Sequence, residues 1–137
     1  MKKYHNSMMR TAYIWADESY CERKKVGAVL AKKGRILACG YNGTVVGTDN
    51  KCEEKNSNNE IISKKDVVHA EANALSFAGR YGIKTNGCTM YITLSPCIEC
   101  AKLMIQHGIK KVYYSEDYRD LSGVLFLKEH GVKIKKI

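Results

Sequence analysis

Two short motifs, well separated along the chain, constrain the fold more than any other feature. The first places His69 two residues before Glu71, and the second places Pro96 directly before Cys97, with Cys100 three residues further on. Imidazole and thiolate groups are ligands that zinc prefers, and three protein ligands leave the fourth position of a tetrahedral ion open, as in catalytic sites. We therefore expect a fold that brings both motifs together around one zinc ion.

Both motifs lie where helices are expected to begin. The spacing of apolar residues predicts helices over 69–80 and 97–107. Cys97 and Cys100 then point to nearly the same face of one helix. The partial positive charge of a helix N-terminus helps to keep such thiols deprotonated, as zinc ligation requires.

Glu71 has a different expected role from the metal ligands. Two positions along an ideal helix correspond to a rotation of about 200°, so Glu71 does not share the direction of His69. A carboxylate beside an open zinc position can move protons to and from a reacting group. An H-x-E motif followed by P-C-x-x-C is the signature of zinc-dependent nucleobase deaminases, in which hydroxide attacks C4 of cytosine. A structural zinc site or a buried thiol pair needs no such carboxylate, and Glu99 is expected to be exposed surface.

The remaining pattern predicts an α/β fold with a single domain over residues 1–137. Strands separated by single helices favour parallel pairing with right-handed crossovers, whereas the first two strands form an antiparallel hairpin. We expect a five-stranded mixed sheet flanked by helices, with a polar insertion over about 43–66 that is functional or mobile. Besides the two motif helices, the predicted elements are helices over 4–19 and 121–129 and strands over 25–31, 35–41, 88–94, 111–114 and 132–137.

Charge and hydropathy limit the class of protein. The formal net charge is +9, and basic pairs recur along the chain without forming one dense block. This charge fits a solvated surface or an attraction to phosphate, and charge alone does not separate the two. No run approaches the ~20 apolar residues that span a bilayer. Because no signal peptide follows the basic N-terminus, we expect a cytoplasmic protein with no membrane contact.

Six cysteines are present, and in a cytoplasmic chain reduced thiols or metal ligation are expected rather than disulfides. Cys97 and Cys100 are assigned to zinc. Cys39 and Cys88 lie in predicted strands and are expected to pack in the core.

Beyond the zinc motifs, the chain resembles the deoxycytidylate (dCMP) deaminases of the cytidine deaminase-like superfamily over most of its length, a resemblance that extends to viral and phage members. The more specific signal is Gly-Tyr-Asn-Gly at 40–43 followed by the long polar insertion. Further matching segments are 19–23, 26–29, 52–53, 69–75, 93–97 and 114–120. The resemblance implies a three-layer α/β/α cytidine deaminase-like fold, catalytic Zn²⁺, and hydrolysis of dCMP to dUMP and ammonia, which supplies dUMP for thymidylate synthesis.

The resemblance also implies how the nucleoside is held. Asn42 would hydrogen-bond the sugar, and Tyr118 would lie near the base or the sugar. The Ala70 N–H would contact the base carbonyl. The Ser95 carbonyl would accept a hydrogen bond from the amino group that is removed.

Arginines are the expected ligands of the substrate phosphate, because guanidinium makes bidentate contacts to phosphate. Arg23 and Arg119 are the main candidates, and Lys24 is a weaker one. Each of these side chains also fits an ordinary surface charge.

Regulation and assembly are implied by the resemblance alone. The implied effectors are dCTP as activator and dTTP as inhibitor, with Mg²⁺ on the triphosphate, and the implied assembly is a homo-oligomer, often a hexamer. Glycine lets backbone approach phosphates closely. The candidate effector-binding residues are Gly40, Tyr41, Asn42, Gly43, Gly47 and Asp49. An ordinary turn in an unregulated enzyme is the alternative.

Cys21 and Cys52 remain open between two interpretations. Some viral relatives carry a second, structural zinc that uses cysteines in these regions, and plain reduced cysteines are the alternative. No obvious further ligand accompanies the pair, so His5, His107 and His130 are candidates only by default.

Three other functions use the same zinc motifs. A polynucleotide deaminase acting on tRNA or single-stranded DNA fits the charge, but the aromatic residues expected of a strand-binding groove are few. Tyr4, Tyr13 and Trp15 fall on the first predicted helix, where core packing explains them better. Deamination of a free nucleoside or of dCTP is the second alternative. The third is a zinc-stabilised interaction module without catalysis, which Glu71 argues against.

Overall fold

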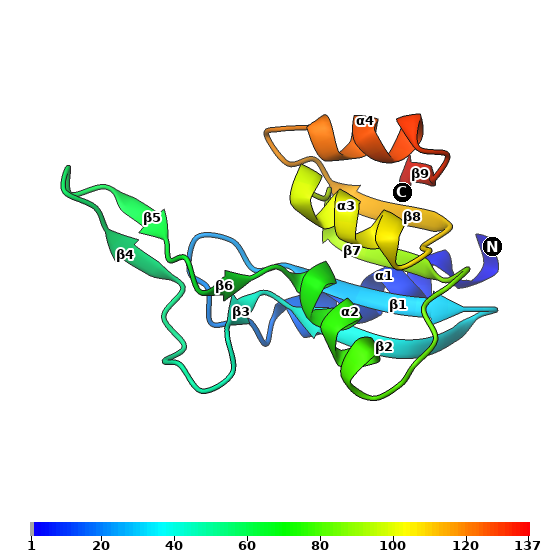
Figure 1. The fold of residues 1–137 in the computed structure, drawn as a ribbon, viewed down its shortest axis with the longest axis horizontal. Coiled ribbons are helices and arrows are strands. Elements are labelled where there is room, and N and C mark those ends of the chain that lie inside the picture. The colour runs from blue at the N-terminus through cyan, green and yellow to red at the C-terminus, as the bar shows by residue number, and fades with distance from the viewer. Residues whose placement is uncertain (1) are drawn as a thin grey trace.

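The computed structural model describes residues 2–137 as a sheet between two helical layers (Figure 1). This arrangement confirms the predicted three-layer α/β/α fold. The helices are α1 (Lys2–Ala16), α2 (Ala70–Arg80), α3 (Ile98–Gln106) and α4 (Ser122–Glu129). The strands of the main sheet are β1 (Gly27–Lys32), β2 (Arg35–Tyr41), β7 (Thr89–Leu94), β8 (Lys111–Glu116) and β9 (Lys133–Lys136).

The five strands lie in the order β2-β1-β7-β8-β9. β1 pairs antiparallel with β2 and with β7, whereas β7, β8 and β9 pair in parallel. The expected mixed sheet is confirmed. Only β1 runs against the other strands, because the β1–β2 connection is a hairpin and each later connection contains a helix.

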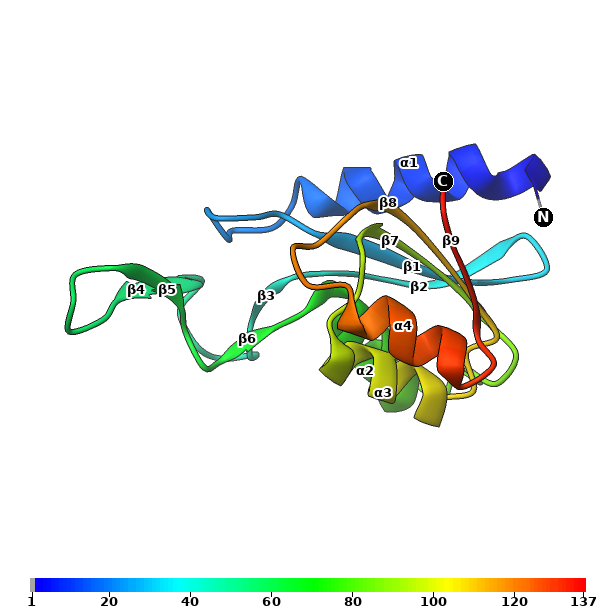
Figure 2. The same ribbon diagram turned by 90° about the horizontal axis from the view of Figure 1, so that it is seen from above.

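The two faces of the sheet bury different residues. α1 covers one face, and α2, α3 and α4 cover the other (Figure 2). The larger core lies under the three helices and includes Leu30, Leu75, Ile92, Met104 and Leu127. The core under α1 is smaller and consists of Met8, Met9, Ala12, Val29, Ala31, Tyr91 and Tyr113.

Three aromatic residues of α1 do not all pack as expected. Tyr4 packs against the core under α1. Tyr13 and Trp15 are partly exposed, so the expectation of core packing is wrong for these two. The Tyr13 hydroxyl donates to the Glu116 carboxylate, and the Trp15 ring stacks on Tyr41. Tyr13 is therefore held by a hydrogen bond and Trp15 by ring stacking, and neither is buried in the core.

The polar insertion contains strands that the sequence analysis did not predict. β3 (Gly43–Thr44) pairs with β6 (Val67–Val68), and β4 (Glu53–Lys55) pairs with β5 (Ile61–Ser63). The β4–β5 hairpin projects from the body of the protein (Figures 1 and 2). These strands have two or three residues each, too few for an apolar alternation to mark them; β4 and β5 are largely exposed, and β3 and β6 are half-buried.

Within residues 2–137, no helix has both the length and the apolar character that crossing a membrane requires.

Candidate active site and zinc centre

The sheet brings the two sequence motifs together through the N-termini of two helices. His69 directly precedes α2 and Cys97 directly precedes α3, each in extended backbone conformation. The His69 Nδ1 atom lies 3.3 Å from Cys100 Sγ and 3.5 Å from Cys97 Sγ. The three predicted metal ligands thus converge on one point.

The spacing of these atoms fits a tetrahedral zinc ion. Zn–N and Zn–S bonds of ordinary length at tetrahedral angles place a nitrogen and a sulfur about 3.6 Å apart. The two observed N···S distances, 3.3 and 3.5 Å, are close to that value. Histidine with two cysteines is also a ligand set that zinc takes in catalytic sites, where the fourth position is open.

The two thiols share a hydrogen bond, and their pKa values shift in opposite directions. The hydrogen bond from Cys100, followed by that from His69, lowers the pKa of Cys97 to about 4. The same contact with Cys97, together with burial, raises the pKa of Cys100 well above its ordinary value. Zinc ligation would require both sulfurs as thiolates, which the charge of the ion would stabilise.

Glu71 lies in the first turn of α2, and only 4% of its surface is exposed. Burial raises the pKa of this carboxyl group. A raised pKa suits a group that must both accept and release a proton near neutral pH.

The hydrogen bond with Cys97 raises the pKa of His69 against the opposing effect of burial.

A pocket of about 430 Å³ is lined by His69, Cys97 and Glu71. All six residues predicted to bind the substrate line this one pocket, although they come from five segments of the chain. They are Arg23, Asn42, Ala70, Ser95, Tyr118 and Arg119, joined by Lys24.

Two of these residues organise the walls of the pocket with their side chains. The Asn42 amide donates to the Lys24 carbonyl at 2.8 Å and accepts from the Val26 N–H at 2.9 Å. The Ser95 hydroxyl oxygen accepts from the Tyr118 N–H at 2.7 Å. Asn42 therefore orders the loop before β1, and Ser95 orders the loop after β8.

The basic side chains of the pocket differ in how far they are neutralised. Lys24 Nζ lies 2.8 Å from a Glu116 carboxylate oxygen. The other carboxylate oxygen of Glu116 accepts a hydrogen bond from the Tyr13 hydroxyl. The Arg119 guanidinium lies over the Tyr118 ring, 5.6 Å from its centre. In the part of the chain that the structure describes, Arg23 and Arg119 form no ion pair. The two arginines are thus better placed than Lys24 to hold an anion.

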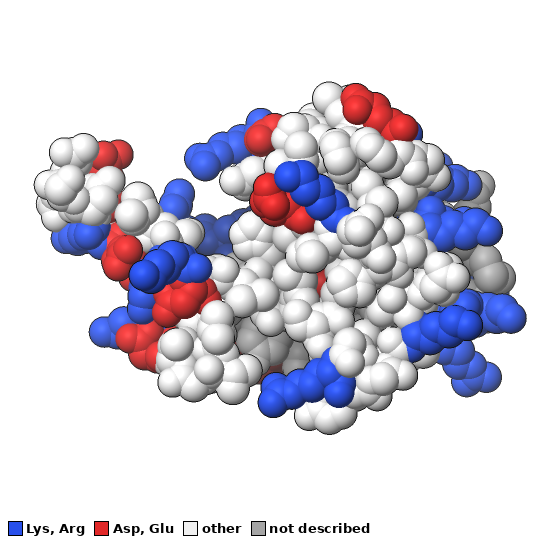
Figure 3. Space-filling model, in the orientation of Figure 1, with Lys and Arg blue, Asp and Glu red and all other residues white. Residues whose placement is uncertain are grey.

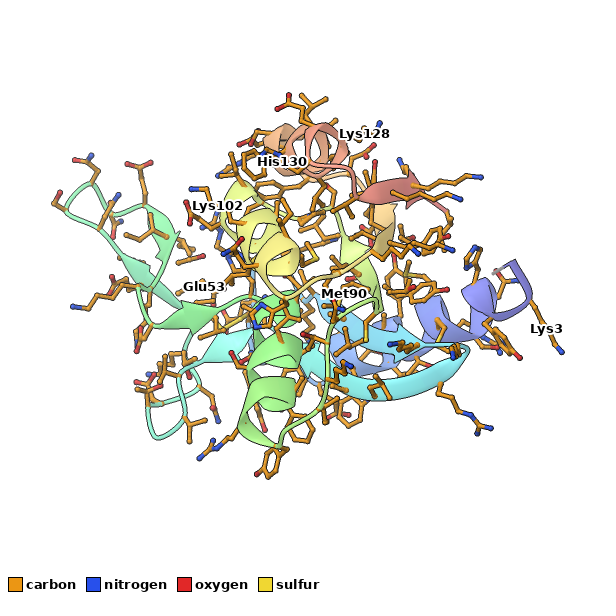
Figure 4. The ribbon with its side chains drawn as sticks, turned by 45° about the vertical axis from the view of Figure 1, so that its right-hand side comes forward. Lys3, Glu53, Met90, Lys102, Lys128 and His130 are labelled. Atoms are coloured by element: carbon orange, nitrogen blue, oxygen red, sulfur yellow. A yellow bond between two sulfur atoms is a disulfide. The ribbon has the colours of Figure 1, made fainter. Side chains whose placement is uncertain are left out.

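Sequence reasoning missed Glu116 and Glu53, which both line the pocket. Glu116 ends β8, where it reads as an ordinary surface charge. Glu53 lies at the base of the insertion, facing the loop that carries Arg23 (Figure 4). No local pattern reveals either role, because each depends on a partner distant in sequence.

Of the six candidate effector residues, only Asn42 lines the pocket. A Cβ atom on Gly40 would lie 2.6 Å from the Ala74 nitrogen, so this glycine is required by the close approach of α2 to β2. Tyr41 stacks with Trp15, and its carbonyl accepts a hydrogen bond from Asn73.

The other three effector candidates lie at or within the insertion. Gly43 pairs with Val68, and Gly47 has a positive φ of 91° in an open turn. Asp49 forms an ion pair with Lys64 at 3.1 Å. The structure therefore does not bring these residues to the zinc pocket.

Cys21 and Cys52 form a disulfide, which corrects the expectation of reduced or metal-bound thiols. The loop after α1 and the start of β4 meet here, and both side chains are buried. Of the three histidines named as default ligands of a second zinc, none lies at this pair. His5 bonds the Tyr91 hydroxyl, and His107 and His130 contact carbonyl oxygens of α3 and α4. Only the Glu53 carboxylate lies within ligand distance of the two sulfurs among residues 2–137.

The two cysteines assigned to the core behave nearly as expected. Cys88 is fully buried directly before β7, and Cys39 is half-buried in β2.

Comparison with known proteins decides the family. The profile of the cytidine and deoxycytidylate deaminase zinc-binding region matches residues 2–116. The chain belongs to this family. Deoxycytidylate deaminase of Enterobacteria phage T4 is 36% identical, across 82% of this chain and 78% of the phage protein. Deoxycytidylate deaminase of Mus musculus is 35% identical, across 93% of this chain and 76% of the mouse protein.

A solved structure from this family has the same fold. The dCMP deaminase of cyanophage S-TIM5, in complex with dCMP and dUMP, superposes with a TM-score of 0.91 at 36% identity. The match covers 100% of this chain and 98% of the cyanophage chain. The predicted family and fold are confirmed, as is the predicted resemblance to phage members of the family.

Proposed function

We propose that this protein is a zinc-dependent hydrolase that converts dCMP to dUMP and ammonia. The observation that carries the proposal is the cluster of three zinc ligands, two of which line one pocket together with the buried carboxyl group of Glu71 and two arginines. The names of the T4, mouse and cyanophage relatives support the same substrate. The product would supply dUMP for thymidylate synthesis.

His69, Cys97 and Cys100 would hold the zinc ion. Bound zinc supplies a hydrolytic nucleophile at neutral pH, because it lowers the pKa of water towards ~7. The Glu71 carboxylate accepts the proton of the attacking water and passes it to the ring nitrogen of cytosine. It then takes the proton of the new hydroxyl group on C4 and delivers it to the amino group, so that the C4 carbonyl forms as the C4–N bond breaks and ammonia leaves. Burial of Glu71 excludes bulk water from these transfers.

The backbone around the metal offers groups that can orient the base. Ala70 is the first residue of α2, and the first N–H groups of a helix have no partner within that helix. We assign its N–H to the carbonyl oxygen of cytosine. The Ser95 carbonyl, beside Cys97, would accept a hydrogen bond from the amino group, and Asn42 and Tyr118 would contact the sugar or the base.

The substrate phosphate is assigned to Arg23 and Arg119. Both line the mouth of the pocket, whereas Lys24 is held by Glu116. Guanidinium groups bind phosphate through two parallel hydrogen bonds, so an unpaired arginine is a specific phosphate ligand.

Regulation is a separate part of the proposal. We assign dCTP activation and dTTP inhibition, with Mg²⁺ on the triphosphate, to Gly40, Tyr41, Asn42, Gly43, Gly47 and Asp49, in a homo-oligomer such as a hexamer. The open backbone at Gly43 and Gly47 supports this assignment, because no neighbouring atom lies within 4 Å of a Cβ at either position.

The proposed function is tested by ammonia release from dCMP, dCTP, deoxycytidine and a cytosine-containing oligonucleotide, each with and without dCTP-Mg or dTTP-Mg. We expect turnover of dCMP that rises with dCTP and falls with dTTP. Turnover of the oligonucleotide alone would overturn the assignment and make the basic side chains at the end away from the insertion a binding surface (Figure 3).

A further inference from the structure

We propose that Glu53 is a positioning residue that holds Arg23 in place for the substrate phosphate. This inference rests on the proposed function, because it takes dCMP as the substrate. It assigns a task to the polar insertion, which carries Glu53 in β4. Figure 4 shows Glu53 at the junction between the insertion and the body of the protein.

The Glu53 carboxylate binds the tip of the loop that leads from α1 to β1. The Glu22 N–H donates to both carboxylate oxygens, at 3.3 and 3.2 Å, and the Arg23 N–H donates to one of them at 3.2 Å. Hydrogen bonds to a charged acceptor are about twice as strong as neutral ones. One side chain thus fixes two consecutive peptide groups at the residue that carries the phosphate ligand.

The other anchors of this loop lie on either side of Arg23. Asn42 binds the backbone of Lys24 and Val26, after the tip. The Cys21–Cys52 disulfide ties the loop before the tip to the residue that precedes Glu53. Glu53 is therefore the contact that sets the backbone at Arg23 itself.

The hydrogen bonds that Glu53 accepts from the backbone matter because the Arg23 side chain is not held over the pocket by an ion pair of its own within the described residues. A free loop would have to be ordered each time substrate binds, and that entropy cost would weaken binding. The loss concerns phosphate binding and not the chemistry at zinc.

The test compares Glu53→Ala and Glu53→Gln with Glu54→Ala, measured with dCMP and with deoxycytidine, which lacks the phosphate. Glu54 is the neighbouring carboxylate of the same strand and is exposed, so it is a matched control. For Glu53→Ala we expect KM for dCMP to rise about tenfold, which corresponds to about 1.4 kcal/mol. The kcat for dCMP and the kcat/KM for deoxycytidine should stay within about twofold.

The Glu53→Gln variant and a double variant separate positioning from general stability. Glu53→Gln keeps an oxygen acceptor without the charge, so we expect a KM between those of wild type and Glu53→Ala. In an Arg23→Ala background, Glu53→Ala should change KM less than about twofold, because Glu53 acts through Arg23.

Three results would overturn the inference. If Glu53→Ala and Glu54→Ala have the same KM for dCMP, Glu53 does not position the loop. A lower KM in Glu53→Ala would mean that the carboxylate competes with phosphate. Equal losses for dCMP and deoxycytidine would indicate a structural role only. Wild-type protein that fails to deaminate dCMP would instead refute the proposed function, and this inference with it.

Discussion

Replacing Glu71 with Gln removes the proton carrier while keeping nearly the same shape. Glu71 lies next to the metal ligands, but its carboxylate does not belong to the cluster formed by His69, Cys97 and Cys100. General acid–base catalysis by a positioned side chain contributes about 10²- to 10⁴-fold to rate. We therefore expect kcat for dCMP to fall by at least 10²-fold, or about 3 kcal/mol of barrier. The assay measures ammonia release and zinc content on the same protein preparation.

Glu99→Gln provides the matched control, because Glu99 directly precedes the zinc ligand Cys100 but is exposed and paired with Lys102. This control should keep kcat within about twofold, as surface changes usually do. Full activity in Glu71→Gln would refute the proton-transfer role. Loss of zinc from Glu71→Gln would show that the carboxylate supports the metal instead.

Three further predictions follow from the packing and the charges. Cys97→Ala should abolish zinc retention and turnover together, as measured by metal analysis and ammonia release. Gly40→Ala should lower the free energy of unfolding by about 1–3 kcal/mol, because the new Cβ overlaps α2, whereas Gly79→Ala on the open side of α2 should not lower it. The hydrogen bond from Lys24 lowers the pKa of Glu116, so its stabilisation is present above pH 4.5 and is lost as the pH falls through the folded-state value. Thermal unfolding of Glu116→Gln should accordingly depend less on pH below 4.5 than that of wild type.

The zinc centre could be predicted from sequence because its signals are local. His69 and Glu71 are two residues apart, and the ligands Cys97 and Cys100 are three residues apart. Each motif lies at the start of a helix that the spacing of apolar residues also predicts. The main sheet was predictable for the same reason. The second strand was placed at its observed bounds, Arg35–Tyr41, because a Lys-Lys-Gly turn precedes it and the Gly-Tyr-Asn-Gly segment at 40–43 ends it.

The polar insertion was predicted, but its strands and contacts could not be, because its order comes from contacts between distant segments. Glu53 reads as one charge in a polar stretch, and only the fold places it against the loop at Arg23. The pairing of Cys21 with Cys52 could not be predicted for the same reason, because the two cysteines are 31 positions apart in the sequence. Short exposed strands of this kind carry no hydrophobic period from which to infer them.

The most direct test of zinc-dependent dCMP hydrolysis is ammonia release from dCMP by protein that has been stripped of metal and then reloaded with zinc. We predict that stripping abolishes turnover and that zinc restores it in proportion to the metal bound at His69, Cys97 and Cys100. Turnover by the zinc-free protein, or no turnover of dCMP by the fully loaded protein, would contradict the assignment.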